Sequence, residues 1–170
     1  MKNPFSVPYT RVQLSFFAII LLAVVCGQIF CLATPARGTE LSVPTLDVSA
    51  GKPFDIPLMV DKVEKLAGVK IVLHYDKTYL SFAKAAKTKK TSSLMHVVND
   101  KTPGRLILVM AGPKGISGEK FALLMLTFKV RRPVKQKKRV EFKIDRVEMM
   151  NEKLKNIPCK IDPGSITLQP

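Results

Sequence analysis

The sequence contains no tryptophan and only three tyrosines among its 170 residues. β-Sandwiches that bind sugars usually stack them on flat, exposed aromatic rings, and after residue 36 the only tyrosines are Tyr75 and Tyr79. Tyr75 shares the alternating phase of Val69, Ile71 and Leu73, which places it on the buried side of a predicted strand. The sequence therefore offers little material for an aromatic sugar platform.

Cysteine and histidine are also scarce, with three and two residues respectively. Cys26 and Cys31 lie in the N-terminal segment, so Cys159 is the one cysteine that follows residue 36. A single cysteine cannot form an internal disulfide, and we interpret it as a buried thiol rather than a reactive one. His74 and His96 occupy strand positions without a neighbouring acidic pair, although a catalytic base needs an orienting partner.

No other motif supplies the chemistry of an enzyme or a cofactor site. Asp145 and Glu148 flank Arg146 and are typical of a solvated strand edge rather than a metal site. The glycines of residues 112–118 lack the Gly-Lys-Ser/Thr ending of a phosphate loop, so Lys114 is expected in a plain turn. We therefore predict a protein that is not an enzyme and needs no cofactor.

Acidic residues are half as frequent as basic ones, with 13 Asp and Glu against 28 Lys and Arg. Lys2 and Arg11 are the only charged residues before position 37, so the remainder carries 26 basic and 13 acidic residues, a net charge of +13. Such a charge attracts polyanions and acidic surfaces. The lysine-rich runs 84–90 and 131–139 have no interleaved aromatic residues for base stacking, which argues against nucleic acid.

The first 36 residues have the layout of a secretory signal. Lys2 and Arg11 precede an apolar run over Leu14–Leu32, and small residues follow at Ala33 and Ala36. We predict cleavage after one of these two alanines. The alternative is an uncleaved membrane anchor, because a run of 19 apolar residues can also cross a bilayer. Either interpretation places residues 37–170 outside the cytoplasm, secreted or at the cell-envelope surface.

Residues 37–170 are predicted to form one all-β domain. Apolar residues recur at every second position in many short segments, which is typical of strands with one buried face. We expect nine strands, at 41–48, 54–60, 68–76, 80–82, 94–98, 106–111, 121–130, 140–149 and 165–168. Such a series favours an antiparallel β-sandwich or jelly roll.

Several details of this strand prediction can be tested against a structure. Pro44 should restrict the first strand to an edge or a bulge. The phase of the strand at 140–149 slips near Asp145, which predicts a β-bulge there. The charged segment 61–67 and the glycine-rich segment 112–118 are expected to connect separate strands. Leu106–Ala111 is apolar at every position, so both faces of that strand should be covered.

Taken in order, these segments resemble a cohesin module over residues 41–169. The resemblance rests on an early glycine after the first strand, a glycine-led strand ending in a Tyr-Asp turn and Leu-x-Phe, an apolar strand before a glycine-rich loop, and two later strands. The corresponding segments are Val48–Gly51, Gly68–Phe82, Leu106–Gly118, Leu126–Val130 and Gly164–Leu168.

The resemblance implies a nine-stranded jelly roll that binds a dockerin module and performs no catalysis. It also implies that calcium belongs to the dockerin partner and that the complex helps to assemble polysaccharide-degrading enzymes. The partner would bind one face of a sheet, which includes the strands at Gly68–Asp76 and Leu106–Ala111. The outward, partner-binding candidates carried over are Lys70, Val72, His74, Leu108, Met110 and Gly115.

Two other functions compete with this interpretation. One is a carbohydrate-binding module of related sandwich fold, with a preference for acidic polysaccharide because of the positive charge. The other is a structural accessory of an envelope assembly, anchored in the membrane through residues 14–32. The outward side of the strand Gly68–Asp76 also has an alternative explanation, in which Val72 and its neighbours fill a second core beneath a loop.

Overall fold

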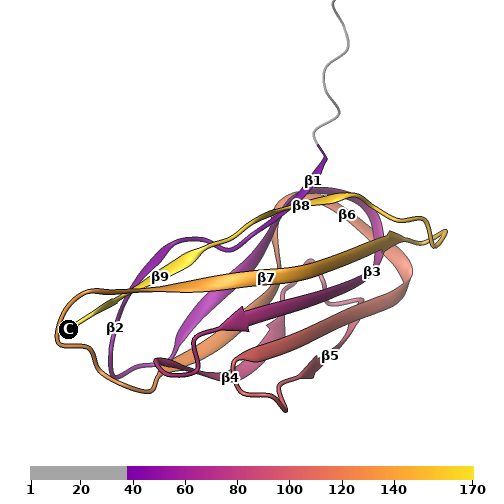
Figure 1. Cartoon of the computed structure of the whole chain (residues 1–170). Helices are drawn as coiled ribbons and strands as arrows, with labels where there is room; N and C mark the ends of the chain where they lie inside the picture. Colours follow the sequence, from indigo (N-terminus) through magenta and orange to yellow (C-terminus); the bar gives the residue numbers. More distant parts are fainter. Residues whose placement is uncertain (1–37) are drawn as a thin grey trace, which may run out of the picture. The chain divides into compact units, whose positions relative to one another are not determined.

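The computed structural model describes residues 38–170, and these form nine β-strands without any helix (Figure 1). The all-β prediction is therefore confirmed for this part of the chain. The apolar run 14–32 and the proposed cleavage sites lie outside the described residues. The strands are β1 (Thr39–Ser42), β2 (Leu46–Ser49), β3 (Phe54–Tyr75), β4 (Leu80–Lys87), β5 (Met95–Asn99), β6 (Arg105–Val130), β7 (Lys138–Asn151), β8 (Cys159–Asp162) and β9 (Ser165–Gln169).

The strands form a sandwich of two layers, and β3 and β6 contribute to both. In the first layer the order is β5–β6–β3–β7–β9–β2, in which residues 105–111 of β6 pair with residues 68–74 of β3. In the second layer the order is β4–β6–β3–β1–β8, in which β6 and β3 contribute residues 121–128 and 54–60. Apolar side chains of both layers meet between them and build one core.

The great length of β3 and β6 was not predicted. Segments 61–67 and 112–118, expected as connections, stay hydrogen-bonded to each other and carry both strands from one layer to the next. The pairing shifts register between Val63 and Leu66, and Lys65 has a φ of 53°. Such bulges bend a strand without ending it. Gly115 has no side chain to prevent β6 from approaching the Lys65 backbone closely.

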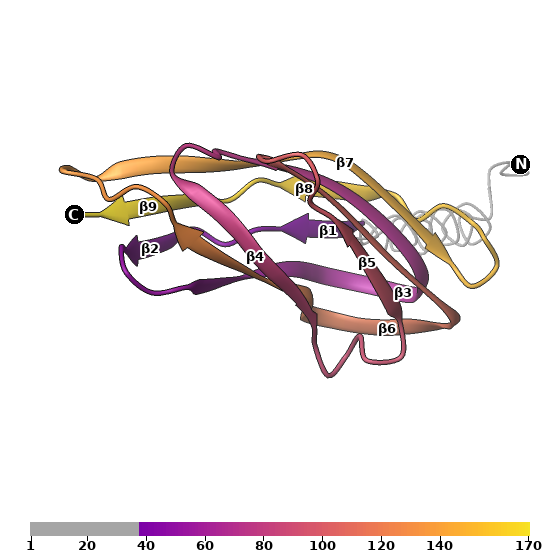
Figure 2. The same cartoon turned by 90° about the horizontal axis from the view of Figure 1, so that it is seen from below.

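The predicted opening strand is interrupted around Pro44 and forms two strands, whereas we expected a single strand at an edge or with a bulge. β1 ends at Ser42 and β2 begins at Leu46. β1 runs beside β8, and β2 runs beside β9 (Figure 2). Both pairings are parallel, so the sandwich is not antiparallel throughout as the sequence had indicated.

Phe128 lies at the centre of the core. Its side chain is fully buried, and four aromatic rings from β3, β4 and β7 surround it. The ring centroids lie 5.1 Å away for Tyr75, 5.2 Å for Phe142, 5.6 Å for Phe82 and 6.3 Å for Phe54. Three of these pairs have the edge-to-face geometry that aromatic rings favour. This cluster joins the two layers at one end of the sandwich.

Arg37–Pro170 forms a compact unit of its own. The buried core cluster lies within residues 41–168, and no buried side-chain nitrogen or oxygen of the described residues lacks a hydrogen-bond partner. A unit that closes its own core and satisfies its polar groups can fold alone. We therefore expect the fragment of residues 37–170 to fold when it is expressed by itself.

Candidate protein-binding face

The surface of the first layer that faces away from the core is defined by the strand register. Lys70 lies opposite Val109 of β6 and Glu148 of β7, and Val109 lies opposite Val97 of β5. Residues that lie opposite one another in antiparallel strands share a face. By this rule the "outer face" comprises Met95, Val97, Asn99, Arg105, Ile107, Val109, Ala111, Gly68, Lys70, Val72, His74, Lys143, Arg146, Glu148 and Met150.

Three of the predicted site residues lie on this outer face. Lys70 and His74 are partly exposed, and they flank Val72 on the central strand β3. Val72 is 6% exposed, yet it does not belong to the hydrophobic core cluster. Its neighbours on the face, Ile107 and Arg146, lie opposite it on β6 and β7. Val72 is therefore a buried residue in the middle of the outer face.

The outward orientation predicted for Leu108 and Met110 is wrong. Both side chains are 1% exposed and belong to the hydrophobic core. They lie opposite Ile71 and Val69, which also face the core. The sequence could not reveal this phase because every residue from Leu106 to Ala111 is apolar. The alternate residues of the strand, Ile107, Val109 and Ala111, take the outer positions instead.

The most exposed apolar residues of the outer face were not predicted. The exposed fractions are 73% for Met95, 66% for Val97, 40% for Met150 and 38% for Val109. One signal in the sequence could have revealed part of this set. Arg105 is exposed and shares the two-residue phase of Val109, just as Asn99 shares the phase of Val97. A polar residue at the end of each strand thus marks the solvent side.

Methionines lie at the two sides of the outer face where β5 and β7 run. Met95 on β5 lies opposite Ala111 on β6. Ala111 lies opposite Gly68 on β3, and Gly68 lies opposite Met150 on β7. A Cβ atom on Gly68 would lie 2.8 Å from Cγ of Met150, so the methionine side chain covers the glycine. Small residues between two flexible thioether side chains form an adaptable apolar surface, which is typical of protein-binding sites.

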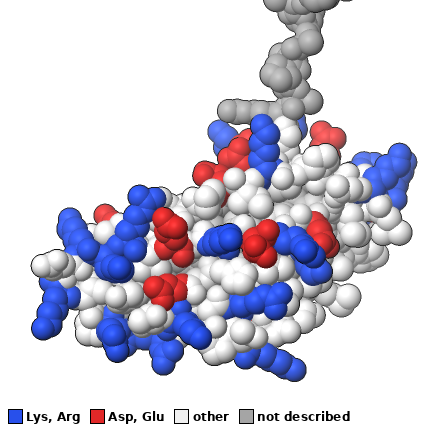
Figure 3. Space-filling view, viewed as in Figure 1, with Lys and Arg blue, Asp and Glu red and all other residues white. Residues whose placement is uncertain are grey.

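Charged residues border this apolar part. Lys70, Arg105, Lys143 and Arg146 are basic, whereas Glu148 is the one acid among the residues that define the outer face. In Figure 3, charged side chains follow one another across the middle of the molecule, where β7 runs. Glu148 lies 3.8 Å from Lys70 and 3.7 Å from Arg146. Both pairs are exposed, so they contribute little to stability and leave a net positive border.

Gly115, the sixth predicted residue, does not lie on the outer face. It packs against the backbone of Lys65 at the bend of β3 and β6. The same Lys65 carbonyl accepts a 3.1 Å hydrogen bond from the Glu152 backbone N–H. A hydrogen bond and the charge of Lys65, whose Nζ lies 3.1 Å away, are the main causes that lower the pKa of Glu152. Gly115 therefore has a structural position at the bend.

We expect Gly115→Ala to lower the free energy of unfolding by about 1–3 kcal/mol, as overpacking does. The new Cβ would lie 2.5 Å from the carbonyl carbon of Lys65, and backbone atoms cannot rotate away. Urea denaturation of fragment 37–170 measures this loss. Gly38→Ala is the matched control, because its Cβ would meet no atom within 4 Å. Equal stability of both variants would contradict the close approach.

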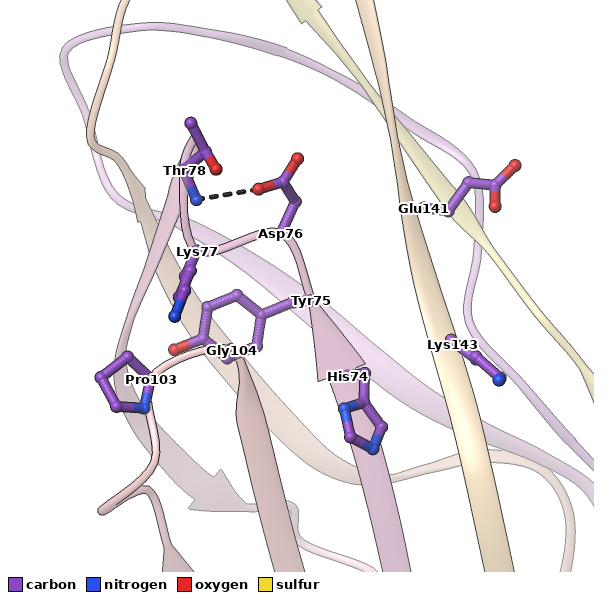
Figure 4. A pocket seen from close by; sticks show the side chains of 9 residues that line it. All are labelled: His74, Tyr75, Asp76, Lys77, Thr78, Pro103, Gly104, Glu141 and Lys143. Atoms are coloured by element: carbon purple, nitrogen blue, oxygen red, sulfur yellow. Dashed lines mark hydrogen bonds between the residues drawn. The ribbon is translucent and has the colours of Figure 1, made fainter.

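An open pocket of about 390 Å³ adjoins the outer face at the His74 end (Figure 4). Its walls come from the end of β3 and the turn after it, from the residues just before β6, and from β7, which contributes Glu141 and Lys143. The turn that closes it is ordered, because Asp76 Oδ1 accepts a 2.8 Å hydrogen bond from the Thr78 backbone N–H. The predicted turn after Tyr75 is thereby confirmed.

The described residues contain no group of three or more His, Cys, Asp and Glu side chains that could hold a metal ion. His96 points away from the outer face, since it lies opposite the buried Met110. Cys159 is half-buried on β8, and desolvation raises the pKa of its thiol to about 11. A thiol with such a pKa stays protonated at neutral pH and is a poor nucleophile.

Comparisons with known proteins agree on one family. The family model described as "Cohesin domain" matches residues 39–168. No curated protein matches the chain.

Solved structures give the same fold at low sequence identity. A non-cellulosomal cohesin from Archaeoglobus fulgidus has a TM-score of 0.69 and 14% identity, covering 78% of this chain and 91% of its own. The sixth cohesin of Acetivibrio cellulolyticus scaffoldin B, solved with a Cel5 dockerin, has a TM-score of 0.71 and 17% identity, covering 78% and 100%. CaCohA2 from Clostridium acetobutylicum has a TM-score of 0.68 and 20% identity, covering 78% and 91%.

Proposed function

Because the chain belongs to the cohesin domain family, we propose that it is a non-catalytic module that binds a dockerin-type protein through its outer face. The observation that carries this proposal is the set of exposed apolar side chains on β5, β6 and β7 of one layer, in which Val97 and Val109 lie opposite each other. Protein interfaces are commonly built from such apolar anchors within a charged border.

The partner class follows from the similar structures. CaCohA2, OlpA and OlpC cohesins have each been solved in complex with a dockerin. Calcium would be carried by the dockerin rather than by this chain. The predicted signal or anchor at residues 1–36 places such a complex outside the cytoplasm, where it would gather polysaccharide-degrading enzymes.

The positive charge of the border indicates the charge expected on the partner. Lys70, Arg105, Lys143 and Arg146 outnumber Glu148 on the outer face, so a complementary dockerin would present acidic residues beside its apolar contacts. Complementary charge raises association rates and suppresses wrong partners more than it raises affinity. Raising the salt concentration should therefore slow association of the two modules.

The test is calorimetric titration of fragment 37–170 with purified dockerin modules from the same organism. Saturable one-to-one binding in calcium, abolished by EDTA, is the expected result, because a dockerin needs its own calcium to fold. A panel of folded, calcium-loaded dockerins that all fail to bind would reject the proposal.

A further inference from the structure

The end of the sandwich that contains the β6–β7 connection gathers basic residues from several strands. In Figure 3, Lys and Arg side chains cluster at the left end, where the C-terminus lies in Figure 1. We define the "basic end" as Lys52, Lys77, Lys129, Arg131, Arg132, Lys135, Lys137, Lys138 and Arg139. None of these nine residues forms a salt bridge within the part of the chain that the structure describes.

Contacts with the β3–β4 turn hold two of these cations, Arg131 and Lys138, beside that turn. Arg131 donates a 2.8 Å backbone hydrogen bond to the Tyr79 carbonyl, and its guanidinium donates to the Lys77 carbonyl at 3.3 Å. The Lys138 ammonium lies 5.6 Å from the centre of the Tyr79 ring. Like charges that are held close together repel, so an anion bound between them would relieve this repulsion.

A second pocket lies within the basic end, and Arg131 and Lys77 line it together. Its volume is about 220 Å³, and its remaining walls are Tyr75, Leu80, Ser81, Phe82, Asp100 and Pro103. We call it the Arg131 pocket. It shares Tyr75, Lys77 and Pro103 with the pocket beside His74, and Figure 4 shows these three residues together. The two pockets therefore adjoin and could hold successive units of a chain.

We propose that the basic end binds an acidic polysaccharide, with one uronic acid unit in the Arg131 pocket. Arg131 uses one nitrogen for the Lys77 carbonyl and keeps other N–H groups for a carboxylate, the anion that a guanidinium fork fits best. The hydroxyl groups of the sugar would meet Ser81 and Asp100, and the parts of Tyr75 and Phe82 that line the pocket would bound its ring. The remaining lysines and arginines would bind neighbouring acidic units.

Two other polyanions fit the basic end less well. A membrane surface would need an exposed apolar residue to insert, and the exposed large apolar residues of the described chain all lie outside the basic end. Nucleic acid would need an aromatic ring free for base stacking. Tyr75, Tyr79 and Phe82 are all packed against the core, and Tyr79 already lies beneath Lys138, so none of them presents a free ring face. A pocket smaller than the 300–1,000 Å³ typical of drug-sized ligands suits a single sugar ring.

Affinity electrophoresis of fragment 37–170 in gels that contain polygalacturonate tests this proposal. We expect strong retardation that decreases as salt rises. Lys77→Gln combined with Arg131→Gln should weaken apparent binding at least 10-fold. The control is Lys153→Gln combined with Lys155→Gln, which removes the same charge from exposed positions in the β7–β8 connection. Equal losses in the two double variants would overturn the proposal.

Two further comparisons identify what is bound. Polyglutamate carries carboxylates without sugar rings, so retardation as strong as with polygalacturonate would overturn the assignment to a polysaccharide. Val97 on β5 lines neither pocket, so Val97→Asp should leave polygalacturonate binding unchanged. The double variant at Lys77 and Arg131 should in turn keep its affinity for a dockerin. Failure of one proposal is thereby distinguishable from failure of the other.

Discussion

Replacing Phe128 with alanine is expected to lower the free energy of unfolding by about 3–5 kcal/mol. The side chain is fully buried, and its ring contacts Phe54, Tyr75, Phe82 and Phe142. Removing it leaves a cavity whose walls belong to both layers, so the structure cannot collapse around it easily. Denaturation of fragment 37–170 by guanidinium chloride measures the loss. Since domains are stable by only about 5–15 kcal/mol, this loss removes a large part of the total.

Phe121→Ala provides the matched control for this measurement. Its ring is only partly buried, and the Lys90 ammonium lies 5.9 Å from the ring centre. Truncation there should cost about 1–2 kcal/mol, because less apolar area and less packing are lost. If both phenylalanines cost the same, Phe128 would not be the centre of the core.

The second large effect concerns partner binding. We expect Val97→Asp combined with Val109→Asp to reduce affinity for a dockerin at least about 100-fold, because two carboxylates would be buried in an apolar contact without partners. The two valines lie opposite each other on β5 and β6 and are 66% and 38% exposed in the free protein. Folding should therefore tolerate both changes. Calorimetric titration gives the affinity, and circular dichroism verifies the fold.

Two controls locate the effect on the outer face. Ala86→Asp introduces one carboxylate at an exposed position of β4, in the other layer, and should leave the affinity unchanged. Met110→Asp should instead abolish folding, because that side chain is 1% exposed. A folded Met110→Asp variant that only loses binding would restore the outward orientation first expected for Met110. Unchanged binding of the double valine variant would remove the outer face from the proposal.

The alternating strands were predictable because burial on one side leaves a clear two-residue period. Val69, Ile71 and Leu73 face the core as this period indicates. The bulge near Asp145 is confirmed, since Leu73 pairs with Ile144 whereas Val72 pairs with Arg146. An extra residue on one strand shifts the buried phase by one position, and the sequence shows this shift directly. For the same reason Lys70, Val72 and His74 could be placed on the outer face from the sequence.

Other features depend on the partner strand and leave no local pattern. The phase of Leu106–Ala111 is fixed only by pairing with β3 on one side and β5 on the other. Continuous apolar sequence is compatible with either orientation, so Leu108 and Met110 were assigned to the wrong side. The glycine-rich segment 112–118 is composed like a loop, yet it lies within a strand, where Gly115 permits a close backbone approach.

The continuity of β3 and β6 has a consequence for how the domain loses its structure. Each strand forms the middle of both layers, so one layer cannot open while its two central strands stay in place in the other. Partly unfolded states in which only one sheet has melted are therefore suppressed. We therefore expect the outer face and the basic end to unfold together, as parts of a single cooperative unit.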